Sequence, residues 1–392
     1  AIYYSFTPAN AVGVSNGNAI DVSLDEKYNL EAAVYVGNRQ KINHWLSLEY
    51  GLRYSHFQLF GPGKVYQYND TIPGFRRYPV SEENIAKGES IVDYNNLEPR
   101  ASFRVQLSPK SSLKGSYNRM VQYLHLISNT AASNPLDVWT PSSREIKPEL
   151  ADQFTLGYFR DLGPGKEYEL SLETYYRIAQ NQVDYIDGAD ILSNEFLEGD
   201  LLSGRGRAYG LEAYLQKKTG KLTGWVSYTL ARTESKVNGI NNNEWYPTRY
   251  DQTHNLKVAG FYDVSERVSL SSNFVFVTGS PSTFPTSRFV LQDLLIPYNA
   301  NNSRNNVRLP AYHRLDVSCT LQGKKMKKGR KRKIEDNWVF SIYNLYSRRN
   351  PFSIYFSQRD QRVVDNNPID SKAVQFSIIG SLIPAVSYNF KF

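Results

Sequence analysis

Arginine occurs together with tyrosine or tryptophan in three polar stretches of the sequence, at 57–96, 124–150 and 236–252. Flat aromatic rings beside forked guanidinium donors suit the binding of sugars, peptides or anionic chelates. Aromatic residues in loops also commonly pack one loop against another, so ligand contact and loop packing both stay open. The candidate ligand-binding residues are Tyr66, Tyr68, Arg76, Arg77, Tyr78, His125, Trp139, Arg144, Trp245, Tyr246 and Arg249.

A fourth polar stretch, 184–205, is acidic. A calcium site needs about six or seven converging oxygen ligands, and no regular spacing of that kind is visible here. We therefore expect solvated acidity and no metal. The carboxylates concerned are Asp184, Asp187, Asp190, Glu195, Glu198 and Asp200.

Catalytic motifs are missing from the sequence. Five histidines and the single Cys319 form neither CxxC nor HExxH, and there is no GxSxG elbow or P-loop. A hydrolase built from separate loops would depend on His125, the only histidine in a long polar stretch. His254 and His313 fall in alternating segments, where a packed or interfacial histidine is expected. We expect no enzyme, cofactor or metal.

Alternation of apolar and polar residues dominates the remaining chain. In 46–55 each leucine or tyrosine is followed by a small or charged residue, and 168–178 shows the same period. Successive side chains of a strand point to opposite faces, so each segment predicts a strand with one apolar face. We expect fourteen strands, at 2–8, 28–37, 46–55, 101–107, 113–123, 151–161, 167–178, 207–217, 221–235, 254–264, 267–277, 312–321, 337–356 and 372–392.

The last segment keeps one phase to Phe392 without interruption. It predicts one unbroken strand of roughly 60 Å, at ~3.3 Å per residue. Strands of globular proteins usually end at about 10 residues, so this length exceeds that of an ordinary sandwich.

The connections alternate between short turns and long polar segments. Short turns are expected at 38–43, 108–111, 162–166, 218–220 and 264–266, with long segments between them. Backbone groups find no partner in a bilayer core, so strands persist there only in a sheet closed on itself. Long strands with loops sorted by length therefore favour an all-β transmembrane antiparallel barrel, with the apolar face outward and the charged face in the lumen. Interfacial aromatic girdles would include Trp45, Tyr123, Trp338, Tyr388 and Phe390.

Other classes of protein fit the sequence less well. No apolar run reaches 18 residues, which excludes a helical membrane protein. A large secreted β protein with half-buried strands is the alternative fold. The net charge of +8 would permit nucleic-acid binding, but eight cationic residues lie in the single turn 323–333, without stacking aromatics. We interpret that turn as solvated and in contact with anionic lipid head groups, and expect no nucleic-acid partner.

Residues from about 97 to the end resemble the C-terminal part of the barrel of TonB-dependent outer-membrane receptors. The order and spacing of several stretches carry this resemblance, and Phe392, with Phe390, looks like the aromatic end that barrel-assembly machinery recognises. The matching stretches are Arg144–Tyr158, Arg207–Glu212, Gly220–Thr229, Asp251–Leu256, Leu309–Val317 and Ser387–Phe392.

The resemblance implies a 22-stranded barrel, an N-terminal plug in the lumen and a box that couples to TonB. This chain shows neither plug nor box, so we expect residues 1–392 to be the C-terminal portion of a longer outer-membrane barrel. The implied function is import of a scarce nutrient, such as a siderophore, vitamin, glycan or peptide, across the outer membrane of a Gram-negative bacterium. The implied partners are outer-membrane lipid, the TonB complex and the barrel-assembly machinery.

Two alternatives remain open at this point. The chain could be a complete fourteen-stranded passive channel that begins at Ala1. It could instead be a structural or docking barrel of a surface complex, with a lipoprotein lid as a partner. Extra plug residues upstream would favour the importer over the channel, and co-purification of a ligand would favour it over the docking subunit.

Overall fold

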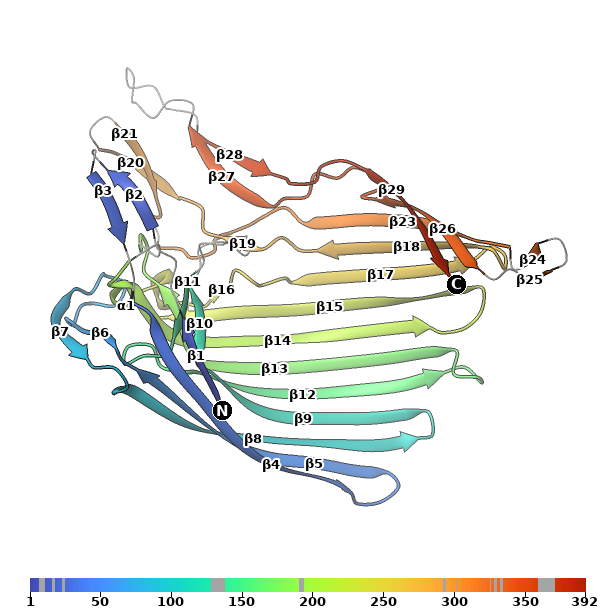
Figure 1. Cartoon of the computed structure of the whole chain (residues 1–392), viewed down its shortest axis with the longest axis horizontal. Coiled ribbons are helices and arrows are strands. Elements are labelled where there is room, and N and C mark those ends of the chain that lie inside the picture. Colours follow the sequence, from blue (N-terminus) through green and yellow to red (C-terminus); the bar gives the residue numbers. More distant parts are fainter. Residues whose placement is uncertain are drawn as a thin grey trace.

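The chain forms one long antiparallel meander. The computed structural model describes residues 1–392 except 7–10, 16–17, 23–24, 128–137, 190–193, 292–293, 301, 325, 328–329, 332–333 and 359–370. Fourteen strands follow one another in the main sheet, as the alternation predicts (Figure 1). They are β1 (Ile2–Phe6), β4 (Lys27–Lys41), β5 (Leu46–Phe60), β8 (Ser90–Ser108), β9 (Ser111–Gln122), β12 (Glu149–Leu162), β13 (Tyr168–Tyr185), β14 (Leu201–Lys217), β15 (Leu222–Val237), β17 (His254–Asp263), β18 (Val268–Val277), β23 (Tyr312–Gln322), β26 (Glu335–Tyr343) and β29 (Ile383–Lys391).

The two ends of the sheet differ. The short turns lie together at the right of Figure 1, and the long connections lie at the left, where they form small hairpins of their own. The additional elements at the long-loop end are β2 (Ala11–Ser15), β3 (Asn18–Val22), β6 (Gly63–Tyr68), β7 (Pro79–Ile85), β10 (Leu124–Ile127), β11 (Val138–Pro141), α1 (Leu197–Asp200), η1 (Asn241–Asn243), β16 (Tyr246–Pro247), β19 (Pro281–Ser282), β20 (Ser287–Leu291), β21 (Leu294–Tyr298), β22 (Val307–Arg308), β27 (Ser353–Gln358) and β28 (Ser371–Phe376). The basic turn contains β24 (Met326–Lys327) and β25 (Arg330–Lys331), and some of its cations fall outside the described residues.

Cross-strand register confirms the two faces. Leu48 lies opposite Phe103, and Leu172 lies opposite both Tyr158 and Ala213, so apolar side chains share one face over many strands. Glu173 lies opposite Glu212 on the other face. We call these the apolar face and the polar face. Large apolar side chains remain exposed along the apolar face, Leu172 at 40% for example, as lipid contact requires.

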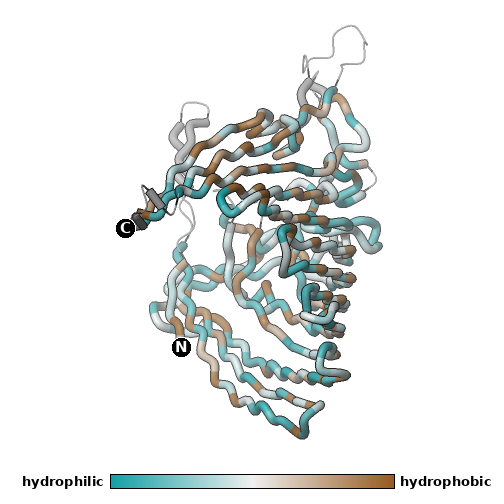
Figure 2. Tube along the Cα trace, turned by 90° about the vertical axis from the view of Figure 1, so that its right-hand side faces the viewer, coloured by the Kyte–Doolittle hydropathy of each residue, from teal (hydrophilic) through white to brown (hydrophobic). Residues whose placement is uncertain are grey.

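The sheet is bent into an arc, and its two edges turn to the same side (Figure 2). β1 pairs only with Lys27–Glu31 of β4, so Ala32–Lys41 have a strand partner on one side alone within the described part of the chain. At the other edge β29 pairs with β26. No helix among the described residues has the length and hydropathy needed to cross a bilayer.

Two expected strands are broken. Residues 337–356 divide into β26 and β27, and 372–392 divide into β28 and β29. Asn344 and Ser347 adopt positive φ angles of 56° and 55°, which turn the chain out of the main sheet after β26. The residues before Ile383 therefore have no continuation of β26 to pair with, and the pairing of β29 with β26 begins at Ile383. The prediction of one unbroken final strand was therefore wrong, because alternation specifies the face of each side chain and not the continuity of pairing.

The aromatic girdle is formed with one exception. Trp338, Tyr388 and Phe390 cluster on the apolar face near the short turns, with ring centroids of Trp338 and Tyr388 4.7 Å apart, and Trp45 is 43% exposed at the β4–β5 turn. Tyr123 is only 5% exposed and stacks on Phe57 at 4.9 Å. It turns inward because β9 ends at Gln122, so its assignment to the girdle was wrong.

Three small clusters of buried apolar side chains hold the long-loop end together. They are Phe57, Leu59 and Tyr123; Ile127, Ile146 and Leu201; and Val237, Ile240 and Tyr246. Segments far apart in the sequence meet in the second cluster, where Ile127 of β10 and Leu201 of β14 pack together. The loops are thus a packed layer at one end of the sheet.

Candidate ligand-binding cavity

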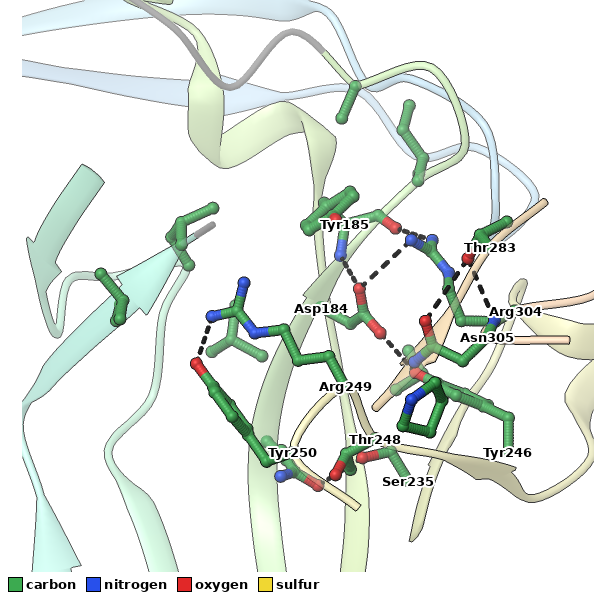
Figure 3. A pocket seen from close by; sticks show the side chains of 18 of the residues that line it. Asp184, Tyr185, Ser235, Tyr246, Thr248, Arg249, Tyr250, Thr283, Arg304 and Asn305 are labelled. Atoms are coloured by element: carbon green, nitrogen blue, oxygen red, sulfur yellow. Dashed lines mark hydrogen bonds and ion pairs between the residues drawn. The ribbon is translucent and has the colours of Figure 1, made fainter. Parts of the chain in front are cut away.

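A cavity of about 610 Å³ opens on the polar face at the long-loop end, between β10, the outer ends of β13 and β15, and the loops after β16 and β19. Its volume falls in the range of roughly 300–1,000 Å³ that small-molecule sites occupy. Figure 3 shows the side chains that point into it. Its polar lining includes Gln122, His125, Gln182, Asp184, Tyr185, Asp187, Tyr246, Arg249, Tyr250, Thr283, Arg304 and Asn305.

One wall of the cavity is a charge network built from three separate segments of the chain: the end of β13, β16 and the connection that carries Arg304. Asp184, near the end of β13, accepts a hydrogen bond from the Tyr246 hydroxyl at 2.5 Å and lies 3.8 Å from Arg304 Nη1. Arg304 also donates to the Tyr185 carbonyl at 2.6 Å and lies 3.3 Å from Asp187. Burial and the charge of Asp184 raise the pKa of Tyr246, so its hydroxyl stays protonated and acts as a donor. This wall is already hydrogen-bonded and therefore fixes the shape of the cavity.

The opposite side carries Arg249 and Tyr250. The Arg249 side chain extends into the space and donates from Nη2 to the Tyr250 hydroxyl, and its guanidinium carbon lies 4.6 Å from the centre of the Tyr250 ring (Figure 3). Tyr250 is 59% exposed. An accessible phenol held beside a guanidinium can bind an anionic or aromatic group of a ligand.

His125 lines the same cavity and is buried at 4% exposure. Burial lowers its pKa to about 4, so its ring is neutral at physiological pH. Its Nε2 lies 3.0 Å from the Ser142 hydroxyl oxygen, and Ser142 is fully buried. A nucleophile must reach its substrate, so the His125–Ser142 contact is structural.

Four other candidates lie together in a second, smaller cleft of about 130 Å³ near β6 and β11: Tyr66, Tyr68, Trp139 and Arg144. Tyr66 donates to Glu195 at 2.6 Å, and Arg144 donates to Glu83 at 2.6 Å. Burial raises the pKa of Tyr66 and Tyr68. Tyr66 and Arg144 thus already have carboxylate partners, so this cleft is the weaker candidate for a ligand.

Arg76 and Arg77 anchor one loop to another. Arg76 makes two hydrogen bonds of 2.8 Å to Asp200, whose side chain is 1% exposed, and Arg77 donates to Glu145 at 2.7 Å and to the Glu198 carbonyl at 2.8 Å. The β6–β7 connection is therefore fixed on α1, in accordance with the loop-packing interpretation.

The described carboxylates of the acidic stretch 184–205 are paired with basic residues. Asp187 and Glu195 remain exposed to solvent, as expected, whereas Asp200 is buried, which corrects the expectation of solvated acidity at that position. Besides Asp184, Asp187 and Asp200, Glu195 lies 3.9 Å from Lys64 and Glu198 lies 3.4 Å from Lys27. Asp190 lies outside the described residues. Across the described part of the chain, no group of three or more histidine, cysteine or carboxylate residues is arranged to hold a metal ion.

The β6–β7 connection also touches the β15–β17 connection, at a pair of glycines. Gly74 has φ +102° and Gly239 has φ +91°, and a Cβ atom on Gly74 would lie 2.7 Å from the Gly239 carbonyl oxygen. Asn302 donates to that same carbonyl at 3.2 Å. The β6–β7 and β15–β17 connections thus meet backbone to backbone, and the segment after β21 joins them through the Asn302 side chain.

Tyr78 and Trp245 do not line either space. Tyr78 is 62% exposed at the base of the β6–β7 connection. Tyr246 pairs with Ser235 and points into the cavity, so its neighbour Trp245 points to the other face, where Arg207 lies 4.2 Å above its ring. Of the predicted residues, the structure thus brings His125, Tyr246 and Arg249 together around one cavity.

The sequence matches the model of the TonB dependent receptor-like β-barrel family over residues 2–345. The chain belongs to this family. This match confirms the resemblance expected from sequence. It begins at residue 2, whereas the resemblance was expected only from about residue 97. The family consists of receptor barrels and not of enzymes. No curated protein is significantly similar to the chain in sequence.

Solved structures share the fold at low identity. The ferric yersiniabactin uptake receptor FyuA from Yersinia pestis is 11% identical, with a TM-score of 0.58, over 94% of this chain and 46% of its own. The siderophore receptor PiuA from Acinetobacter baumannii is 14% identical, with a TM-score of 0.56, over 95% and 44%. The FrpB iron transporter from Neisseria meningitidis is 12% identical, with a TM-score of 0.55, over 94% and 46%. The chain spans about half the length of these structures.

Sequence reasoning missed part of the cavity. Arg304, Asn305 and Thr283 come from the long segment 278–309, which has few aromatic residues near them. A signal was present, because Arg304 is the only basic residue between Arg288 and Arg308 and lies among asparagines. The sequence marks its partner Asp184 only as one carboxylate of the acidic stretch 184–205.

Proposed function

We propose that this chain is the ligand-capturing part of an outer-membrane receptor barrel that imports a nutrient in a TonB-dependent manner. The supporting observation is the cavity on the polar face at the long-loop end, where Arg249 and Tyr250 project into a space closed by Asp184, Tyr246 and Arg304. Family membership supports the same assignment. On this proposal the long loops face the exterior of a Gram-negative cell, and the short turns face the periplasm.

The substrate class we propose is a ferric chelate or another anionic, partly aromatic molecule. Arg249 would donate to its negative groups, and Tyr250 would stack on its rings. The structural neighbours include an uptake receptor for ferric yersiniabactin and a siderophore receptor, which supports this class. A plug and a TonB-coupling segment in the receptor beyond this chain would then gate the lumen, and barrel-assembly machinery would recognise Phe390 and Phe392.

Binding to the purified full-length receptor tests the ligand class. A panel of ferric siderophores, oligosaccharides and peptides is titrated against the wild type, Arg249→Ala and Tyr78→Ala. We expect a ferric chelate to bind, Arg249→Ala to weaken binding by roughly tenfold or more, as loss of a charged hydrogen bond does, and the remote Tyr78→Ala to have no effect. Binding by none of the panel, or equal binding by Arg249→Ala, would contradict the proposal.

Uptake separates the importer from its alternatives. Cells that depend on the receptor for the ligand should lose uptake when TonB is deleted. Uptake that persists without TonB would indicate a passive channel. Absence of both binding and uptake, with a stable surface complex, would indicate a structural or docking barrel.

A further inference from the structure

A cluster of charges lies on the apolar face, where lipid is expected. Glu234 of β15 accepts from Arg207 Nε at 2.8 Å and from Arg232 Nε at 3.0 Å, so one carboxylate serves two guanidinium groups. Register places all three on the same face as Phe154 and Leu211, because Arg207 lies opposite Ile178 and Glu234, and Arg232 lies opposite Tyr209. The two arginine side chains are 34% and 35% exposed, while Glu234 is 10% exposed.

The charge of this cluster is unbalanced. Arg232 also lies 3.6 Å from Asp251, but that carboxylate is shared with Arg308. Three arginines and two carboxylates leave one positive charge in excess. A guanidinium has five N–H donors, and within the described residues the contacts of Arg207 with Glu234 use its Nε and Nη2 groups. The cluster can therefore accept a further anionic partner from outside.

An open apolar groove runs down the face from these arginines. Its volume is about 900 Å³, and it crosses β12, β13, β14 and β15. The short side chain of Thr174 forms its floor on the apolar face, because the Thr174 hydroxyl is turned to the Gly210 carbonyl at 2.9 Å. Larger side chains stand around it, and the apolar-face residues of the groove are Phe154, Leu156, Tyr176, Tyr209, Leu211 and Leu230, with Arg207 and Arg232 at its outer end.

The apolar face below these arginines has the height of the hydrocarbon layer of a membrane. From Tyr168, beside the short turn, to Ile178, opposite Arg207, the apolar face rises by ten residues. At ~3.4 Å per residue and a tilt of about 40° this is roughly 25 Å, the thickness of the apolar band of a membrane barrel. The arginines thus lie at the outer head-group level and the groove lies in the acyl-chain layer below them.

We propose that this groove binds a phosphate-bearing lipid of net negative charge in the outer leaflet, with an acyl chain over Thr174 and the phosphate on Arg207 and Arg232. Charge complementarity favours this occupant, because a zwitterionic lipid offers the excess positive charge no net partner. Trp245, stacked under Arg207, holds that guanidinium in place and adds an aromatic ring at the interface. The site rests on the membrane placement of the apolar face and does not depend on the cavity, so uptake and lipid binding can fail separately.

Competition between two lipids tests the proposal. The full-length receptor in a neutral detergent is mixed with phosphatidylglycerol and phosphatidylcholine of identical acyl chains, and retained lipids are counted by native mass spectrometry. One excess charge near a membrane surface corresponds to a preference of about fivefold for phosphatidylglycerol. Arg207→Gln with Arg232→Gln should abolish this preference, and Glu234→Gln should increase it. Thr174→Leu should fill the groove and reduce retention of both lipids.

The chain offers a matched control. Arg119 and Asp152 lie on the same face at the same register level and form a balanced pair, with two hydrogen bonds of 2.8 Å. Arg119→Gln with Asp152→Asn should leave the preference unchanged. Equal retention of the two lipids by the wild type, or a preference that survives loss of Arg207 and Arg232 in a folded barrel, overturns the proposal. Displacement by glycerol phosphate, which lacks acyl chains, would also overturn it in favour of a site for soluble phosphate.

Discussion

Trp245 and Tyr246 are neighbours in the sequence, yet they belong to two regions with different surroundings. Tyr246 is 2% exposed and hydrogen-bonded to Asp184 in the cavity of the polar face. Trp245 lies on the apolar face under Arg207. Both regions combine arginine with aromatic rings. The difference shows that composition alone does not identify a binding site, because strand parity decides whether a residue meets an aqueous ligand or a lipid.

The two regions also differ in how their charges are paired. In the cavity, Asp184 and Arg304 are 120 positions apart and meet only through loop packing. On the apolar face, Arg207 and Glu234 are neighbours across two adjacent strands. Loss of loop packing should therefore disrupt the cavity and leave the cluster on the apolar face in place. The following experiments test this contrast.

Asp251 belongs to the apolar-face cluster and also donates its backbone N–H to the carbonyl of Thr248, a residue that lines the cavity, so its removal should have the largest effect. It is fully buried, accepts from the Thr233 backbone N–H at 2.5 Å and contacts both Arg308 and Arg232. Asp251→Ala leaves buried donors without their acceptor and should cost about 3–5 kcal/mol of unfolding free energy, measured by urea titration in detergent. Asp251→Asn keeps an acceptor for Thr233 and should cost less. A loss below about 1 kcal/mol in the alanine variant would show that the regions are not coupled here.

Adjacent positions on β13 compare the two faces directly. Leu172→Arg places a charge against hydrocarbon and should cost about 2–4 kcal/mol in lipid vesicles if Leu172 lies near the midplane. Ser171→Arg, on the polar face, should cost far less. Equal losses in the two variants would contradict the assignment of the faces.

Acid should weaken the cavity region through His125. Its folded pKa of about 4 lies below its ordinary value of 6.5, so the unfolded chain binds a proton more readily. Above pH 6.5 the neutral ring makes its full contribution to the free energy of unfolding. This contribution is lost as the pH falls from 6.5 towards 4. Unfolding free energy should drop by about 2 kcal/mol between pH 7 and pH 5. His125→Gln should remove most of this dependence, and an identical pH profile in that variant would exclude His125 as its cause.

The basic turn 323–333 should matter least. We interpret this turn as solvated, and substitutions at solvated positions change the unfolding free energy by less than about 0.5 kcal/mol. Replacement of its eight cations by glutamine and serine should leave ligand uptake intact, as measured with radiolabelled ligand in whole cells. Complete loss of uptake would show that the short-turn end takes part in function.

The sequence predicts the two faces of the main sheet well, and the strand ends and long connections poorly. The alternation of apolar and polar residues predicts which face of the sheet Leu48 and Leu172 lie on. The register between neighbouring strands then keeps such apolar residues on one face. The breaks after Tyr343 and before Ile383 depend on Asn344 and Ser347, residues that tolerate positive φ but do not demand it. Tyr123 turned inward because its strand ended one residue earlier, and alternation gives no signal for an end. Arg304 meets Asp184 only after folding, so no local pattern could pair them.

The contact between Gly74 and Gly239 sets how far apart two connections can stand. A single methyl group at Gly74 would push the β6–β7 and β15–β17 connections apart, because it would meet backbone atoms of Gly239 and no side chain that could move away. The separation of the two connections is thus limited by one carbon atom, at positions that are not among the residues lining the cavity. Alanine at Gly74 would move the loops and leave the lining side chains unchanged, so a change in ligand selection by that variant would be due to loop spacing alone.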